Sequence, residues 1–263
     1  FPYTTLFRSQ NRNMNVWYRL DFLDEKIFGP NNGSELQPEK VSDKDFLTKR
    51  YTHQLQSDWK LDNRLDVHAA LSYQDYKRRT RTTESDLSTG EKWLSSAEAS
   101  QDITQYKAWI ARATVAWNIA PEFSVQPGVE YQWTQGEGGH IDGTPKVSDL
   151  AFFLSAEYKP WEWLSLRPGV RTFIVADYDA PIAIPSVLTK FKLTKHMDLR
   201  LSYAYGFRSP TLQELYFSFH NDNHDIDGNP DLKAEYSHNI TGSVAYRVLH
   251  SEKIHLKTTL SGF

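Results

Sequence analysis

The feature that most constrains the fold of this chain is an alternation of apolar and polar residues with a period of two. Across 65–73 the odd positions are apolar, and most even positions are polar. The segments 123–134, 164–171 and 198–205 alternate in the same way. Because successive side chains of a strand point to opposite faces, the pattern predicts β-strands with one face in an apolar medium.

Roughly eleven candidate strands follow from this pattern. Most are longer than the about 5–6 residues of a typical soluble strand, and a tilted strand needs about 9–11 residues to cross a bilayer. The lengths therefore favour strands that cross a membrane. The expected spans are 14–27, 43–59, 64–81, 105–118, 123–135, 147–159, 163–176, 185–192, 197–206, 235–249 and 253–263.

The connections between these strands alternate between short and long. The short ones are expected near 60–63, 119–122, 159–162, 193–196 and 250–252, and the long polar ones at 29–42, 82–104, 135–146 and 207–234. A shorter stretch, 177–183, takes a place in the long series. Bacterial barrels combine short periplasmic turns with longer extracellular loops, whereas a sandwich with Greek-key crossings has no reason to alternate. We therefore predict an all-β, antiparallel, up-and-down transmembrane β-barrel, of which this chain holds a part.

Composition is compatible with this interpretation. The sequence contains no run of about 18 or more apolar residues, so no membrane-spanning helix is predicted. The mean hydropathy of −0.60 suits strands whose apolar and polar faces average out. The net charge of −3 gives no strong field toward nucleic acid. Cysteine is absent, which excludes a disulfide scaffold, cysteine metal sites and cysteine nucleophiles.

Several tryptophans lie where the predicted strands end. Trp59, Trp117, Trp161 and Trp163 are at or beside short turns, and Trp133 is at the opposite end of its strand. An indole is apolar with a single N–H donor, so it is favoured at a membrane–water boundary. The positions indicate two aromatic girdles, although they also suit the aromatic core of a soluble β-protein.

Two prolines fall inside predicted strands. Pro127 and Pro168 cannot donate a ladder hydrogen bond, so each is expected at a bulge or on an edge strand.

The first ten residues show no alternation. Residues 1–9 resemble translated sequencing-adapter sequence. We expect residues 1–10 to be a non-native leader and 11–263 to be the partial barrel domain.

No catalytic signature is present. The chain has no G-x-S-x-G, no H-E-x-x-H and no P-loop. A binding protein is therefore expected rather than an enzyme. An outer-membrane barrel protease or phospholipase, and a soluble β-sandwich carbohydrate-binding module, remain alternatives.

Two motifs carry a family resemblance. Gly206–Tyr216 reads GFRSPTLQELY, and Gly228–Glu235 reads GNPDLKAE. The pair resembles the late barrel region of TonB-dependent outer-membrane receptors, G-F-R-[AS]-P-[ST]-x-x-E-L-Y followed by G-N-P-x-L-x-P-E, with Ala234 where Pro is usual. Val16–Phe28 also looks like a strand of that family. The matching positions are Gly206, Phe207, Arg208, Ser209, Pro210, Glu214, Leu215, Tyr216, Gly228, Asn229, Pro230, Asp231, Leu232 and Glu235.

The motifs also have a structural interpretation. Pro210 fixes φ at the start of a turn or short helix, and Asn229–Asp231 is turn chemistry. Arg208 needs acidic partners if it faces the barrel interior. The motifs either organise the barrel rim or contact the ligand directly, and the sequence leaves both open.

The resemblance implies a 22-stranded barrel with an N-terminal plug, in the outer membrane of a Gram-negative bacterium. It implies active import of an iron chelate, haem or cobalamin, energised by TonB. The expected partners are the lipid bilayer, the TonB complex through a plug absent from this chain, and a small-molecule nutrient. No cofactor and no nucleic acid are expected. Both ends of the chain are expected to be cut.

The interval between the motifs holds the candidate ligand residues. In haem receptors of this family a histidine in this interval is implicated in haem capture, and His220 and His224 occupy it here. Imidazole is a common haem-iron ligand, and flat apolar contacts are available from Tyr216, Phe217 and Phe219, with Arg208 nearby. The alternatives are an exposed loop with incidental histidines, or a calcium site at Asp222, Asp225 and Asp227, whose spacing is loose.

Overall fold

A computed structural model describes residues 2–30, 39–97, 100–176, 178, 180–221, 224–250 and 255–263. Nearly all of them are in long β-strands, with one short helix. The elements are β1 (Pro2–Gln10), β2 (Met14–Gly29), β3 (Lys40–Lys60), β4 (Leu65–Asp86), β5 (Lys92–Leu94), β6 (Ile103–Ala120), β7 (Phe123–Glu137), β8 (Lys146–Trp161), β9 (Leu164–Ala176), β10 (Ile184–Lys192), β11 (Met197–Arg208), α1 (Leu212–Tyr216), β12 (Ser218–Asn221), β13 (His224–Asp227), β14 (Glu235–His250) and β15 (His255–Gly262).

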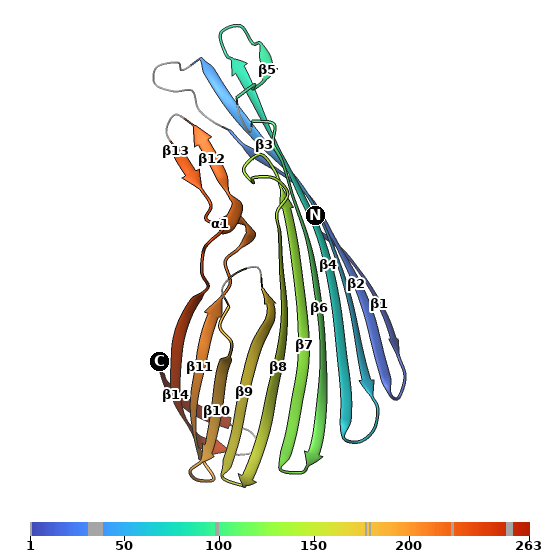
Figure 1. Ribbon diagram of the computed structural model, residues 1–263, viewed down its shortest axis with the longest axis vertical. Helices are drawn as coiled ribbons and strands as arrows, with labels where there is room; N and C mark the ends of the chain where they lie inside the picture. The colour runs from blue at the N-terminus through green and yellow to red at the C-terminus, as the bar shows by residue number, and fades with distance from the viewer. Residues whose placement is uncertain are drawn as a thin grey trace.

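Within the described residues, 13 strands form one antiparallel sheet in chain order, with β5 paired to β4 and β12–β13 as a separate hairpin. Figure 1 shows these strands side by side in one bent wall. The sheet does not close on itself, because β1 and β15 are its two ends. The predicted fold, part of an up-and-down antiparallel barrel, is confirmed.

All eleven predicted strands are present, each within a few residues of its predicted span. Strand β5 and the hairpin β12–β13 were not predicted. Residues 2–10 were not expected to form a strand, yet β1 pairs with β2 from Pro2–Leu23 to Gln10–Asn15. An open sheet edge pairs readily with an extended segment, so this pairing does not bear on the origin of residues 1–10, which stays a prediction.

The connections follow the predicted alternation. In Figure 1 the short turns β3–β4, β6–β7, β8–β9 and β10–β11 lie at the lower end of the wall, and the β4–β6 and β11–β14 connections, with α1 and the β12–β13 hairpin, lie at the upper end. Residues 31–38, 98–99, 177, 179, 222–223 and 251–254 of the predicted connections lie outside the described residues. Side chains set the short turns: the Asp62 carboxylate accepts the backbone N–H groups of Arg64 and Leu65 at 2.6 and 2.8 Å. Among the described residues, no helix is both long and apolar enough to cross a membrane.

Burial on the wall is the reverse of that in a soluble protein. Apolar side chains on one face are open, with Leu154 and Leu201 each 47% exposed. On the other face, Glu130 and Asp198 are each only 8% exposed. A β-sandwich buries its apolar faces between two sheets, and no second layer packs on the apolar face among the described residues. The interpretation as a soluble core is therefore excluded, and the apolar face is the outer face.

Aromatic side chains gather at both ends of the outer face. At the short-turn end, the rings of Trp161 and Trp163 stack with centroids 5.2 Å apart. At the long-connection end, Tyr73 lies 4.4 Å from Trp109, which is directly opposite Trp133 in the register. We call Tyr73, Trp109 and Trp133 the upper aromatic row.

The two strand prolines interrupt the ladder on one side only. Pro127 is opposite Leu154 of β8, but the register between β6 and β7 passes from Thr114–Gly128 to Trp117–Val125 without a partner for it. Pro168 is opposite Val187 of β10 and likewise has no partner on β8. Both lie on interior strands, so the expected edge position is wrong. The missing N–H is accommodated by a local gap in pairing.

Candidate ligand-binding rim

The first motif folds into the end of β11 and a short capped helix. Thr211 is the N-cap of α1: its hydroxyl accepts the Glu214 N–H at 3.2 Å, and the Glu214 carboxylate accepts the Thr211 N–H at 2.7 Å. This reciprocal capping box fixes where the helix begins. Leu212 and Leu215 are 6% and 1% exposed, so the helix is held against the wall by its apolar side.

Arg208 joins the two motifs. Its guanidinium donates to Glu214 at 3.0 Å and to Glu235, the first residue of β14, at 2.5 Å. Charge-assisted bonds of this kind are among the stronger ones in proteins. The hydrogen bond from Arg208, aided by the N–H of Thr211, lowers the pKa of Glu214 to about 2. We call Arg208, Glu214 and Glu235 the rim clamp.

The second motif turns the chain back against α1. The Gly228 N–H donates to the Phe217 carbonyl at 2.5 Å, and the Asn229 N–H to the Glu214 carbonyl at 3.0 Å. A Cβ on Gly228 would lie 2.7 Å from the backbone of Leu215 and Phe217. Only glycine allows this approach. Ala234, in place of the usual proline, is buried.

The segment after α1 reaches back to the β7–β8 connection. The Ser218 N–H donates to the His140 carbonyl, and the Asp142 N–H donates to the Tyr216 carbonyl, both at 3.0 Å. The His140 ring lies 5.8 Å from Phe217 and 4.7 Å from Phe219. The predicted aromatic residues Phe217 and Phe219 are thus together, half-buried and in contact with a histidine from another loop.

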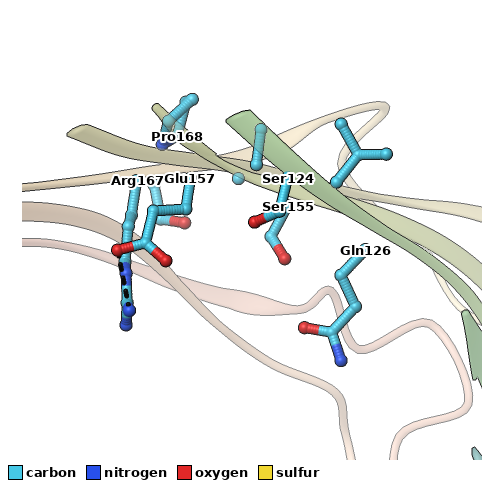
Figure 2. A pocket seen from close by; sticks show the side chains of 10 residues that line it. Ser124, Gln126, Ser155, Glu157, Arg167 and Pro168 are labelled. Atoms are coloured by element: carbon cyan, nitrogen blue, oxygen red, sulfur yellow. Dashed lines mark hydrogen bonds and ion pairs between the residues drawn. The ribbon is translucent and has the colours of Figure 1, made fainter. Parts of the chain in front are cut away.

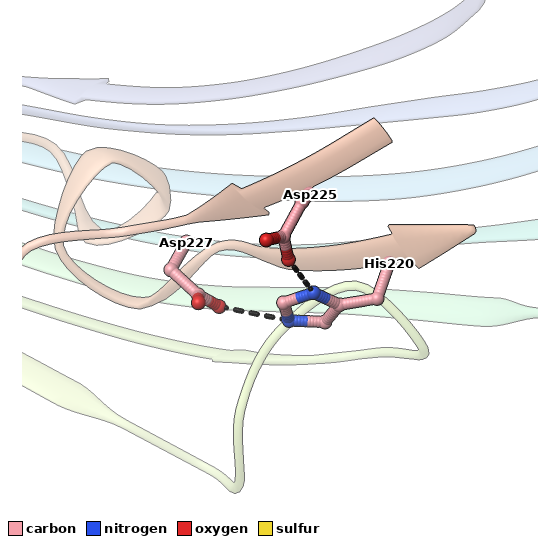
Figure 3. A group of neighbouring side chains, drawn as sticks. All are labelled: His220, Asp225 and Asp227. Atoms are coloured by element: carbon pink, nitrogen blue, oxygen red, sulfur yellow. Dashed lines mark hydrogen bonds and ion pairs between the residues drawn. The ribbon is translucent and has the colours of Figure 1, made fainter. Parts of the chain in front are cut away.

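His220 lies in the hairpin β12–β13 between two carboxylates (Figure 3). Its Nδ1 is 2.5 Å from Asp225 and its Nε2 is 3.0 Å from Asp227. The hydrogen bond with Asp225 and the charge of Asp227 raise the pKa of His220. One atom from each of these exposed residues lies within 4.8 Å of the others, a spacing that could hold a cation. Asp222 and the side chain of His224 lie outside the described residues.

The inner face of the wall is polar and hollowed. A hollow of about 250 Å³ lies on this face. Figure 2 shows side chains that line it, among them Ser124, Gln126, Ser155 and Glu157. Glu157 accepts a hydrogen bond from Arg167 at 3.1 Å and pairs with Lys159 at 2.9 Å. A larger hollow of about 1090 Å³ adjoins it toward the short-turn end.

Cations outnumber acids on the inner face from β6 to β11. Glu130 pairs with Arg171 at 2.7 Å and with Arg112 at 3.6 Å, and Asp198 pairs with Lys190 at 3.5 Å. The basic residues are Arg112, Lys159, Arg167, Arg171, Lys190, Lys192 and Arg200, against the acids Glu130, Asp149, Glu157 and Asp198.

A family model, described as TonB dependent receptor-like, beta-barrel, matches residues 2–263. The chain belongs to this family. It is a family of receptors and transporters, and not of enzymes.

Solved structures of low sequence identity share the fold of this receptor barrel. The siderophore receptor PirA from Pseudomonas aeruginosa aligns with a TM-score of 0.53 and 13% identity, over 94% of this chain and 52% of PirA. FpvA of P. aeruginosa, bound to heterologous pyoverdines, aligns with a TM-score of 0.61 and 13% identity, over 94% of this chain and 39% of FpvA. The copper transporter OprC aligns with a TM-score of 0.58 and 11% identity, over 99% of this chain and 52% of OprC.

The receptor barrel spans about half the length of PirA and OprC. No curated protein gives a significant sequence match.

His140 and the basic inner face of this receptor barrel were not predicted from the sequence. His140 lies in a loop without periodicity, and its contacts with Phe217 and Phe219 join segments far apart in the chain. The inner-face cations are at the polar positions of the alternation. The alternation therefore predicts which face they lie on, but it does not predict that they lie close together. The acidic partners that Arg208 was expected to need are Glu214 and Glu235.

Proposed function

We propose that this chain is part of an outer-membrane receptor that binds and imports a scarce nutrient, energised by TonB. The observation that carries the proposal is the distribution of side chains on the wall, with open apolar side chains on one face and polar side chains on the other, of which Glu130 and Asp198 are buried. An apolar outer face suits lipid, and a polar inner face suits a water-filled interior. The long connections would face outward and the short turns the periplasm.

The ligand class that the inner face favours is an anionic iron chelate. Its surplus of arginine and lysine would attract and guide a negatively charged ligand. The described functions of PirA and FpvA, a siderophore receptor and a pyoverdine-binding protein, support this choice. The rim segment Ser209–Ala234 would contact the ligand first, and the inner face would pass it inward once a plug domain is displaced by the TonB complex.

The test is uptake by cells that express the full-length receptor. We expect outer-membrane fractionation, and energy-dependent uptake of a radiolabelled ferric siderophore. Replacing Arg167 and Arg200 by Gln should lower uptake at least about tenfold, because the loss of even one charge-assisted contact weakens binding by about 1.5–3 kcal/mol and about 1.4 kcal/mol is a factor of ten. A matched variant, Lys60→Gln with Lys195→Gln at the short turns, should take up the chelate normally. Recovery of the receptor from the soluble fraction would contradict the proposal.

Haem is the second candidate ligand, because Phe217, Phe219 and His140 form an aromatic group, and His220 directly follows Phe219 in the chain. Both nitrogens of His220 are already engaged by Asp225 and Asp227, so iron ligation requires that one of these contacts break. Haemin titration of the wild type and of His220→Ala, His224→Ala and the double variant decides it. Equal affinity in all four proteins would exclude both histidines. The calcium site at Asp222, Asp225 and Asp227 stays a prediction, tested by the same titration with Ca²⁺.

A further inference from the structure

Basic side chains gather on the outer face directly beyond the upper aromatic row. Residues with the same orientation follow each aromatic: Lys107 is two residues from Trp109, and Lys77 and Arg79 are four and six residues from Tyr73. Asp75, directly opposite Lys107, lies between Tyr73 and Lys77. Lys49 lies opposite Lys77, and Lys146 lies opposite Gln135, two residues beyond Trp133. We call Lys49, Lys77, Arg79, Lys107 and Lys146 the basic belt. At about 3.3 Å per residue it begins about 7 Å along the strands from the aromatic row.

The charges of the belt are poorly compensated within the described residues. Lys49 and Lys77 are directly opposite in the β3–β4 register, and like charges in this arrangement destabilise a sheet. The ion pair of Lys49 with Asp24 is long, at 3.7 Å, and both side chains are more than half exposed. Such pairs contribute little. The other four cations make no ion pair with a described residue, although Asp75 and Glu137 lie in the same band.

The belt covers one sector of the wall rather than its whole width. On β11 and β14 the outer positions at the upper end hold aromatic rings, with Tyr205 and Tyr236 stacked at 5.9 Å. Among the described residues of β9, β10, β11 and β14, no lysine or arginine takes an outer position at the upper end. The arrangement therefore predicts a local anion site between β3 and β8, and not a general feature of the rim.

We propose that the basic belt binds the phosphate groups of a lipid headgroup in the outer leaflet. This inference rests on the proposed function, which sets the membrane orientation of the wall. A lipid is favoured over a soluble anion because the belt is on the lipid-facing side, next to aromatics that mark the membrane boundary. Lysine and arginine beside an anionic leaflet attract its headgroups. Phosphate between Lys49 and Lys77 would also relieve their mutual repulsion.

The test is lipid retention by the full-length receptor in detergent, measured by native mass spectrometry with diphosphorylated lipid A as the probe. We expect retention to fall about tenfold or more in the triple variant Lys49→Gln, Lys77→Gln, Arg79→Gln. The control variant Lys60→Gln, Arg64→Gln, Lys195→Gln removes three cations at the short-turn end and should retain lipid A as the wild type does. Phosphatidylcholine should be retained poorly by all three proteins.

A second belt variant, Lys107→Gln with Lys146→Gln, removes the two remaining cations of the basic belt. It replaces the triple variant if that variant lacks the heat-modifiable mobility of a folded barrel. Unchanged retention in both belt variants overturns the inference, as does displacement of lipid A by inorganic phosphate at equal phosphate concentration. Uptake and outer-membrane fractionation are measured separately. A receptor that imports its nutrient but does not retain lipid A contradicts the belt alone, and one absent from outer membranes contradicts the proposed function.

Discussion

At Gly228 the two motifs come within backbone contact of each other. The absence of a side chain there lets the chain pass against the end of α1, and Arg208 then pairs with an acid from each motif. The spacing of the motifs therefore reflects a three-dimensional contact. The residues most distinctive in the sequence hold the rim together. The ligand contacts predicted for Arg208 and Tyr216, which belong to the first motif, stay predictions.

We predict that Gly228→Ala loosens the rim. A methyl group 2.7 Å from the backbone of Leu215 and Phe217 forces a shift, and overpacking of this kind costs about 1–3 kcal/mol. Hydrogen exchange of 212–217 in the full-length receptor should accelerate accordingly. Gly262→Ala, where nothing lies within 4 Å of the added carbon, is the control and should exchange as the wild type does. Equal protection in both variants would contradict the prediction.

Single residues show how far the sequence can predict this site. Turn chemistry at Asn229–Asp231 and a short helix after Pro210 could be read directly, because both are local backbone preferences. The contact of His140 with Phe219 could not, because it depends on how two loops meet above the wall. The proposed ligand roles of His220, Tyr216, Phe217 and Phe219 stay predictions.

Among the elements, the hairpin β12–β13 is the one whose stability depends most plainly on pH. It has four residue pairs and no place in the main sheet. Two-stranded hairpins of this size are marginally stable alone in water. Side-chain contacts therefore support the hairpin. Two of them, His220–Asp225 and His220–Asp227, join β12 to β13.

We predict that the hairpin loosens as the pH rises. The pKa of His220 is raised in the folded state by Asp225 and Asp227. Its stabilising charge is thus fully present below the unfolded pKa of about 6.5 and is lost as the pH passes the raised value. Hydrogen exchange of 218–227, corrected for the intrinsic rate, should show less protection at alkaline pH. Asp225→Asn with Asp227→Asn should remove the pH dependence, and an unchanged profile in that variant would refute the mechanism.

Elements with strong alternation were predictable, and elements without it were not. The eleven long strands expose one apolar face throughout, so a period of two reports them directly. β5 has three residues and pairs only at the tip of β4, too short for any periodicity. β12 and β13 are four residues each and carry mostly polar residues, as does an ordinary loop.

For the whole molecule, the decisive property is which face of the wall meets lipid. Leu201 and Ser202 are neighbours on β11 with opposite orientations: Leu201 is opposite Thr189 and Gly242, and Ser202 is opposite Leu188 and Thr241. Leu201 is on the outer face and 47% exposed. The same substitution at these two positions therefore compares the two sides of the wall.

We predict that Leu201→Arg impairs assembly in the outer membrane and that Ser202→Arg does not. An arginine on the lipid face costs about 2–4 kcal/mol near the midplane of the bilayer, whereas an inner-face arginine remains in water. The measurement is the heat-modifiable folded fraction in outer-membrane preparations. Equal loss in both variants, or a greater loss in Ser202→Arg, would refute the assignment of the faces.

The rim segment that leaves β11 does not stay above its own strands. It returns to the β7–β8 connection, where Tyr216, Phe217 and Ser218 bond to residues 140–142, while the rim clamp holds its other end at β11 and β14. The segment thus links the end of β11 to the β7–β8 connection, and the intervening strands of the wall are β8, β9 and β10. Because the segment is attached at both points, its length limits how far the wall can flatten between them. We therefore expect the length of 209–216 to limit how far β8 and β11 can separate at this end of the wall.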